Sequence, residues 1–200
     1  MTGFLTCSSA SYVYSGKGIA VAWDDYNQRT VNVWVNQNRL DNSDDRELMV
    51  SVGHINHYRL PEPDGFGVRS SVTPGLACKD NAAAGGYDCV VAYVDTSNSY
   101  NQVSVRRFIN FQSGNRYYAL SGSTSLVSNA YTSERIALWY ANGTFWLALR
   151  GSSPGQSIAV YSSPDSLTWT AESYNVGTSP IGPSAVGYYT GSINILVYAN

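Results

Sequence analysis

Residues 90–95 read Val-Val-Ala-Tyr-Val-Asp, a nearly continuous apolar run that ends on a carboxylate. Three other stretches share this character, namely Ala20–Asp25, Phe145–Arg150 and Asn194–Tyr198. Continuous apolar runs of this length are typical of strands that are covered on both faces. When Trp23, Tyr93, Leu149 and Tyr198 are aligned, successive repeats lie 70, 56 and 49 residues apart. Such spacings suit propeller blades of roughly 40–50 residues with insertions in their loops.

The segments around these runs organise the chain into repeated units. Each run follows a strand rich in Ser or Tyr, and the first three runs precede a further strand. We therefore predict an all-β protein, a β-propeller of about 3.5 four-stranded blades. The blades of this single domain, residues 1–200, are expected at about 8–55, 68–121 and 129–172, with a half blade at about 183–200. A β-sandwich is the alternative.

Three and a half blades would leave open sheet edges, which are a liability for a β protein. Three ways of closing the ring stay open. A homodimer could complete the propeller, the missing remainder of a longer chain could do so, or the segment Thr2–Thr6 could pair with the last unit to close a small ring.

The composition limits the classes of partner. The 200 residues carry a net charge of −2, and charged residues make up only 13% of them, about half the usual share. No basic stripe is available for a nucleic-acid backbone, so nucleic acid is not an expected partner. No apolar run approaches the roughly 20 residues that span a bilayer. Residues 1–10 lack the pattern of a signal peptide, so none is expected in this sequence.

Two of the three cysteines flank a predicted hairpin loop. Cys78 and Cys89 lie on either side of a segment that contains Asn81-Ala82-Ala83-Ala84-Gly85-Gly86. Facing residues of paired strands come within disulfide distance, so we predict a bridge between them, the alternative being two buried thiols. Cys7 is left over, either buried or paired outside this chain. The bridge and the few lysines favour a secreted or cell-surface protein.

Residues 163–169 read Ser-Pro-Asp-Ser-Leu-Thr-Trp and follow a strand-like run. This stretch resembles the Asp-box, Ser-x-Asp-x-Gly-x-Thr-Trp, of the sialidase-like (BNR-repeat) β-propellers. Ser163, Asp165, Thr168 and Trp169 match the family pattern, Ser166 stands near the glycine position, and the turn is one residue shorter. The resemblance implies a structural role, in which Asp165 accepts bonds from turn amides and the Trp169 ring packs between blades.

The same resemblance suggests catalytic candidates. Tyr58-Arg59-Leu60-Pro61 resembles the aromatic-Arg-Ile-Pro signature of sialidases, in which the arginine binds a substrate carboxylate. Asp24, Asp25 and Asp95 end runs that we aligned as equivalent, so they could share one rim and act in glycoside hydrolysis or bind Ca²⁺. Capping of turns is their other interpretation. No sequence pattern of a serine hydrolase, P-loop or zinc protease is present.

The sequence also contains candidates for metal and ligand binding. Asp41, Asp44 and Asp45 form an acidic stretch that could bind calcium, although it lacks the spacing of an EF-hand and suits a solvated turn; no other cofactor is expected. Aromatic rings can stack on sugars, and the candidates are Tyr26, Trp34, Tyr100, Tyr117, Tyr118 and Tyr140. We predict a non-catalytic recognition module that binds glycan or protein through propeller loops. The alternatives are part of a sialidase-like glycoside hydrolase and a structural assembly domain.

Overall fold

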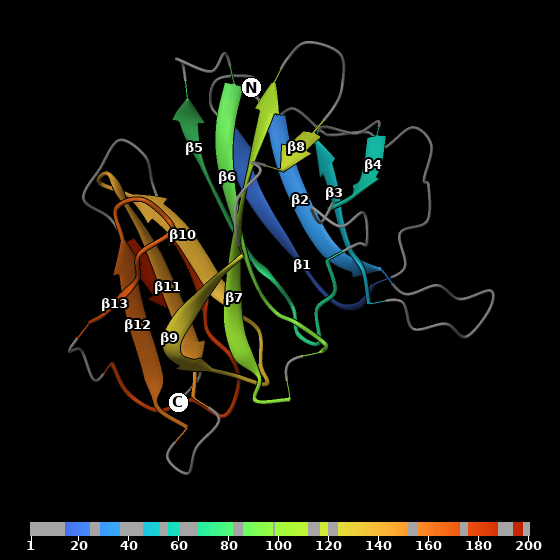
Figure 1. Cartoon of the computed structure of the whole chain (residues 1–200). Helices are drawn as coiled ribbons and strands as arrows, with labels where there is room; N and C mark the ends of the chain where they lie inside the picture. Colours follow the sequence, from blue (N-terminus) through green and yellow to red (C-terminus); the bar gives the residue numbers. More distant parts are fainter. Residues whose placement is uncertain are drawn as a thin grey trace, which may run out of the picture.

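The computed structural model of the chain describes residues 15–24, 29–36, 46–52, 56–60, 68–81, 86–97, 99–111, 117–119, 124–151, 156–172, 176–187 and 194–197. Every regular element in these ranges is a β-strand (Figure 1). The strands are β1 (Ser15–Asp24), β2 (Arg29–Asn36), β3 (Leu48–Val52), β4 (Asn56–Arg59), β5 (Gly75–Asn81), β6 (Gly86–Val94), β7 (Gln102–Phe111), β8 (Tyr117–Ala119), β9 (Ser125–Tyr131), β10 (Ala137–Ala141), β11 (Thr144–Arg150), β12 (Ile158–Ser163), β13 (Thr170–Ala171), β14 (Ser184–Gly187) and β15 (Asn194–Val197).

The strands form successive antiparallel sheets in which neighbours in sequence are neighbours in space. The first sheet has the order β1-β2-β3-β4, the second β5-β6-β7-β8 and the third β10-β11-β12-β13. β9 also pairs with β7 in the second sheet, and β14 pairs with β15. The prediction of an all-β protein is therefore confirmed, and its sheets are antiparallel throughout the described residues.

The first sheet differs from the predicted one. Its described strands run from Ser15 to Arg59, so β4 lies beyond residue 55, at which the first blade was expected to end. Asn56-His57-Tyr58-Arg59 lacks an apolar pattern, and β4 exists because its backbone pairs with β3. The run at 20–25 was also expected to form the second strand of its unit, as β6 and β11 do. Its described residues, 20–24, lie instead in β1, which is the first strand in the described part of its sheet.

The first strands of successive sheets lie next to one another. β1 contacts β5, β5 contacts β10, and β10 contacts β14. The approach is close at Gly75 on β5, where an added Cβ atom would lie 2.8 Å from the Cβ of Leu138 on β10. The sheets therefore form a row whose first strands share one side, and an alanine at position 75 would push β5 and β10 apart.

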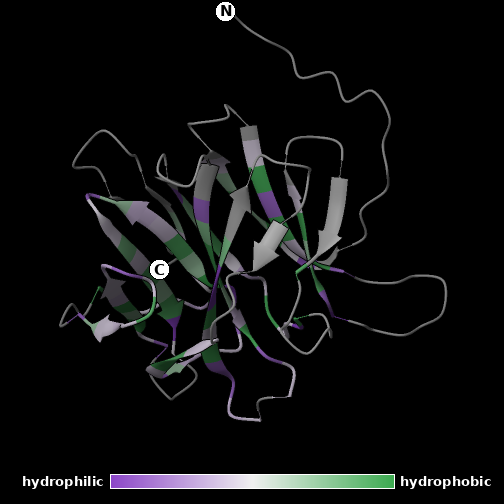
Figure 2. Ribbon diagram, turned by 45° about the horizontal axis from the view of Figure 1, so that its top comes forward, coloured by the Kyte–Doolittle hydropathy of each residue, from purple (hydrophilic) through white to green (hydrophobic). Residues whose placement is uncertain are grey.

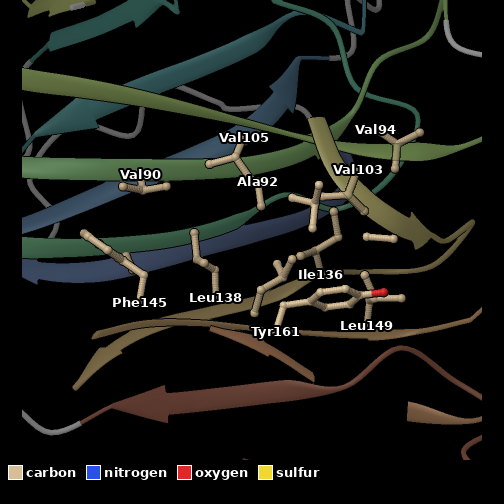
Figure 3. Close-up of a cluster of buried hydrophobic side chains, with 14 of the residues drawn as sticks. Val90, Ala92, Val94, Val103, Val105, Ile136, Leu138, Phe145, Leu149 and Tyr161 are labelled. Atoms are coloured by element: carbon tan, nitrogen blue, oxygen red, sulfur yellow. The ribbon is translucent and has the colours of Figure 1, made fainter. Parts of the chain in front are cut away.

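Side chains of alternating strand positions fill the spaces between the sheets. On β6, Val90, Ala92 and Val94 face the third sheet, while Cys89, Val91 and Tyr93 face the first. Figure 3 shows the core between the second and third sheets, where Val90, Ala92 and Val105 face Leu138 and Phe145. The prediction that the run at 90–95 is covered on both faces is confirmed, because each face of β6 belongs to a different core.

The third sheet is packed on both faces as well. On β11, Phe145, Leu147 and Leu149 face the second sheet, and Ala148 belongs to a separate core that Ala185 of β14 contacts. Figure 2 shows green, hydrophobic stretches along the strands, and purple, hydrophilic segments both in turns and in bands across several strands. The described residues contain no helix of the length and apolar character needed to cross a membrane.

A disulfide joins Cys78 of β5 to Cys89 of β6, with the two Cα atoms 4.1 Å apart. The two cysteines are directly paired in the strand register, as the hairpin interpretation required. The bridge therefore clamps the β5–β6 hairpin next to its tip. Cys7 lies outside the described residues.

Candidate functional site

Charged and aromatic side chains gather where the second and third sheets end beside each other. The second sheet contributes Lys79 of β5, Asp88 of β6 and Arg107 of β7. The third sheet contributes Tyr140 of β10 and Asp165, which follows β12. We call these five residues the rim cluster.

Strand alternation explains why these polar groups face the gap between the sheets. Asp88 shares its face of β6 with Val90 and Ala92, both of which belong to the core between the second and third sheets. Arg107 shares its face of β7 with Val105, a member of the same core. The rim cluster therefore closes one end of this core and forms its boundary with solvent.

Asp88 is the centre of the rim cluster, and its side chain is fully buried at 0% exposure. Arg107 Nε donates a hydrogen bond to Asp88 Oδ1 over 2.6 Å, and Arg107 Nη2 donates to Asp88 Oδ2. Lys79 Nζ lies 3.8 Å from Asp88 Oδ2. A bidentate arginine fixes a carboxylate in position, so Asp88 in turn orients two cations that reach toward solvent.

The third sheet presents aromatic rings to Lys79. The Lys79 ammonium lies 5.9 Å from the ring centroid of Tyr140 and 5.4 Å from that of Phe145, within cation–π range. The two rings pack against each other at a tilt of 52°, with centroids 4.8 Å apart. Phe145 is buried and Tyr140 is partly buried, so Tyr140 supplies the aromatic surface that solvent reaches.

The turn after β12 holds Asp165 beside the rim cluster. The backbone amides of Leu167 and Thr168 each donate to Asp165 Oδ1 over 2.8 Å, and Ser163 Oγ donates to it over 3.0 Å. Ser166 has a φ of 66°, a left-handed conformation that favours glycine. Trp169 packs against the core between the second and third sheets. Asp165 thus accepts hydrogen bonds from three groups of its own turn.

Electrostatics tie the two sheets together at the rim cluster. The pKa of the Arg107 guanidinium is raised, first by its hydrogen bond to Asp88 and also by the charges of Asp88 and Asp165. The pKa of Asp165 is lowered, chiefly by the Thr168 amide, with help from Leu167 and Ser163. Asp165 therefore stays ionised near Arg107 although the two lie on different sheets.

Acid should weaken the turn at Asp165. Because the folded-state pKa of Asp165 is lowered, its contribution to the free energy of unfolding is present above the unfolded pKa and is lost as pH falls through the folded value. We expect Asp165→Asn to lower the melting temperature at pH 7, and the gap from wild type to close below about pH 4. Melting curves of both proteins from pH 2 to pH 7 check this; a gap that does not change with pH contradicts it.

The chemistry of the rim cluster suits a neutral, hydroxyl-rich ligand. Lys79 and Arg107 are hydrogen-bond donors, and Asp165 is an exposed acceptor. Tyr140 offers both a ring face and a hydroxyl group. Two cations balance two carboxylates, so the rim cluster has no excess charge with which to attract an ion of either sign. Among the described residues, no group of three or more His, Cys, Asp or Glu side chains could hold a metal ion.

The predicted ligand-binding aromatics have different surroundings. Tyr100 is 79% exposed in the connection between β6 and β7, so it is available to a ligand. Trp34 is only 4% exposed, and its prediction as an exposed platform is wrong, because it lies in the middle of the first sheet between Ile19 and Met49. The backbone of Tyr117 and Tyr118 lies in β8, and Tyr26 lies outside the described residues.

Among the predicted catalytic carboxylates Asp24, Asp25 and Asp95, the structure describes the side chain of Asp95 alone. Asp95 Oδ1 accepts hydrogen bonds from the backbone amide and the hydroxyl of Ser97, which is the turn-capping role that the sequence analysis weighed. Asp24 ends β1, the first strand of its sheet, whereas Asp95 follows β6, the second strand of another. The equivalence of the two positions is therefore wrong. Arg59 ends β4, whose backbone alone is described. The remaining candidates, Asp25, Asp41, Asp44 and Asp45, lie outside the described residues.

Three members of the rim cluster were missed by the sequence analysis. Lys79, Asp88 and Arg107 lie within three different strands, and none belongs to a recognisable motif. One signal was present: Asp88 directly precedes Cys89, so a bridged hairpin places a carboxylate opposite Lys79. Arg107 could not be added from sequence, because the register of β6 against β7 decides its approach to Asp88.

Comparison with known proteins reveals a shared fold. No protein-family model matches the chain, and no curated protein matches it. The N224Q mutant of Aleuria aurantia lectin in complex with Fucα1-6GlcNAc superposes with a TM-score of 0.54 at 13% identity, over 89% of this chain and 52% of that chain. The same mutant with α-methyl-L-fucoside gives a TM-score of 0.51 at 13% identity, over 84% and 48%. The chain thus spans about half the length of this lectin.

An exo-β-1,3-galactanase from Phanerochaete chrysosporium with bound galactose is a more distant neighbour. It gives a TM-score of 0.48 at 13% identity and covers 77% of this chain and 34% of that chain. These likenesses concern the arrangement of antiparallel strands alone.

Proposed function

We propose that this chain is a non-catalytic module that binds neutral glycans, and that the rim cluster is its binding site. The observation behind the proposal is the position of the Lys79 ammonium group, which lies between the buried Asp88 carboxylate and the ring of Tyr140. A sugar needs hydrogen-bond partners for its hydroxyls and an aromatic surface for its C–H face, and both stand next to each other here. The lectin-like fold supports the same class of ligand.

The proposal favours neutral over acidic sugars. Arg107 donates two hydrogen bonds to Asp88, so its positive charge is already balanced by a buried carboxylate before any acidic ligand arrives. Asp165 adds a further negative charge near Arg107. A sialidase-like centre would instead need free arginines around the substrate carboxylate. We therefore expect hydroxyl recognition without hydrolysis, at the surface of a secreted or cell-surface protein, for which the Cys78–Cys89 bridge is suitable.

The test measures binding of saccharides to wild type and to two lysine variants. The probes are α-methyl-L-fucoside, methyl β-galactoside and sialyllactose, each titrated by calorimetry. We expect one of the two neutral glycosides to bind and Lys79→Gln to weaken its binding by about tenfold, because a charged hydrogen bond is lost. Lys17→Gln is the matched control, since Lys17 lies on β1 in the first sheet, and it should bind like wild type.

Three results would contradict this proposal. If neither neutral glycoside binds, neutral glycans are not the ligand class. If sialyllactose alone binds, the predicted preference for neutral over acidic sugars is wrong. Equal losses in Lys79→Gln and Lys17→Gln would move the site away from the rim cluster. In that case Tyr100→Ala, which removes an exposed ring, tests the connection between β6 and β7 as the site.

A further inference from the structure

One face of β1 carries three exposed hydrophobic side chains. Ile19 is 53% exposed, Val21 58% and Trp23 51%. They occupy alternate positions, so they share one face of the strand. On the opposite face, Ala20 and Ala22 pack against the core between the first and second sheets. The first sheet is therefore covered on one side at β1 and bare on the other.

Equivalent positions elsewhere in the row of sheets are covered on both sides. The first strand of the second sheet, β5, lies between β1 and β10, and the first strand of the third sheet, β10, lies between β5 and β14. Apolar cores fill both spaces around β10. The bare face of β1 thus lies where the next sheet of the row would pack, and it has the apolar character that such packing requires.

A large hydrophobic side chain is also exposed in the segment that leads into β14. Ile181, which precedes β14, is 46% exposed. A row of sheets with two open ends can be closed in a single step when each end packs against the opposite end of a second row. A two-fold axis does this, because the β1 end of each copy then meets the β14 end of the other.

We propose that a second copy of this chain covers the Ile19–Val21–Trp23 face, so that two chains complete one ring of sheets. The length of the fold identifies the occupant. The chain matches 52% of the lectin chain, so two copies of the matched region together equal about the full length of that fold. One additional copy brings the total to about the length of the lectin chain, and a third copy would exceed that length.

The mass in solution tests this proposal directly. We expect light scattering of the wild-type chain to give twice 21.7 kDa across a concentration series, with dissociation only at the dilute end. Val21→Asp places a charge in the contact and should weaken association at least about tenfold, so that the variant is monomeric where wild type is dimeric. Trp23→Ala is a second variant, without a new charge, and should shift the equilibrium in the same direction.

Leu126→Asp is the matched control, because Leu126 on β9 is also exposed, at 56%, but lies away from the β1 face. It should remain dimeric, and circular dichroism establishes that each variant is folded. A wild-type mass of 21.7 kDa at every concentration overturns the proposal. A dimer that Leu126→Asp disrupts as strongly as Val21→Asp and Trp23→Ala also overturns it, because the contact then lies elsewhere. Glycan binding is measured separately, so its failure would leave this test unaffected.

Discussion

Replacing both Cys78 and Cys89 by alanine is expected to lower the free energy of unfolding by about 3 kcal/mol. The bridge closes a short loop, with a sequence separation of 11, and the chain-entropy model assigns roughly that value to a loop of this length. The loss should be large because the β5–β6 hairpin lies between two cores, with Val90 on one face and Val91 on the other. Loosening the hairpin therefore weakens both cores.

Urea unfolding of wild type and of the double variant measures this loss. Wild type treated with dithiothreitol should reach the same midpoint as the double variant, and the double variant should not respond to the reductant. A difference below about 1 kcal/mol between wild type and the variant contradicts the expectation. Such a result would mean that residual structure already keeps the hairpin closed in the unfolded ensemble, so that the disulfide removes little chain entropy.

Removing Arg107 is expected to be about as costly. In Arg107→Met the Asp88 carboxylate remains fully buried with only Lys79 nearby, 3.8 Å away. Breaking a buried ion pair by removing one partner costs about 3–5 kcal/mol of stability. We expect a loss at the lower end, about 3 kcal/mol, because Lys79 remains as a second cation near Asp88. Arg69→Met is the matched control: Arg69 is exposed, and its loss should change stability by less than about 0.5 kcal/mol.

A double variant shows whether the loss of stability comes from an unpaired buried charge or from the change in side-chain volume. Asp88→Leu combined with Arg107→Met replaces both charges by apolar groups facing the core of the second and third sheets. We expect its stability to return to within about 1 kcal/mol of wild type, because no buried charge is left without a partner. If the double variant is as unstable as Arg107→Met alone, the side-chain volumes and not the charges determine stability here.

The glycan proposal and the stability of the rim cluster are linked through Lys79. Lys79 contacts both Asp88 and the rings of the third sheet, so it joins two sheets at the proposed site. A ligand that binds at the rim cluster should therefore stabilise the packing of the second sheet on the third. The Ile19–Val21–Trp23 face is separate, because it lies on β1 at the end of the row.

Local patterns determined much of this fold. The apolar runs at 90–95 and 145–150 predict strands buried on both faces, and β6 and β11 have that arrangement. This prediction needs no information from distant residues, because successive side chains of any strand point to opposite faces. The Cys78–Cys89 bridge follows from the place of the two cysteines on either side of a hairpin loop. The role of Asp165 follows from its own turn, in which every bond to its carboxylate comes from within three residues.

Tertiary structure alone decided which position in its sheet each of the similar apolar runs occupies and which residues distant in sequence come into contact. The run at 20–25 resembles the run at 90–95, but its described residues belong to β1, the first described strand of its sheet. One face of β1 therefore has no neighbouring sheet within the described residues. The rim cluster joins residues far apart in sequence, from Lys79 to Asp165. Their approach depends on strand register and on the packing of one sheet against the next, which are set by long-range contacts that a local pattern does not contain.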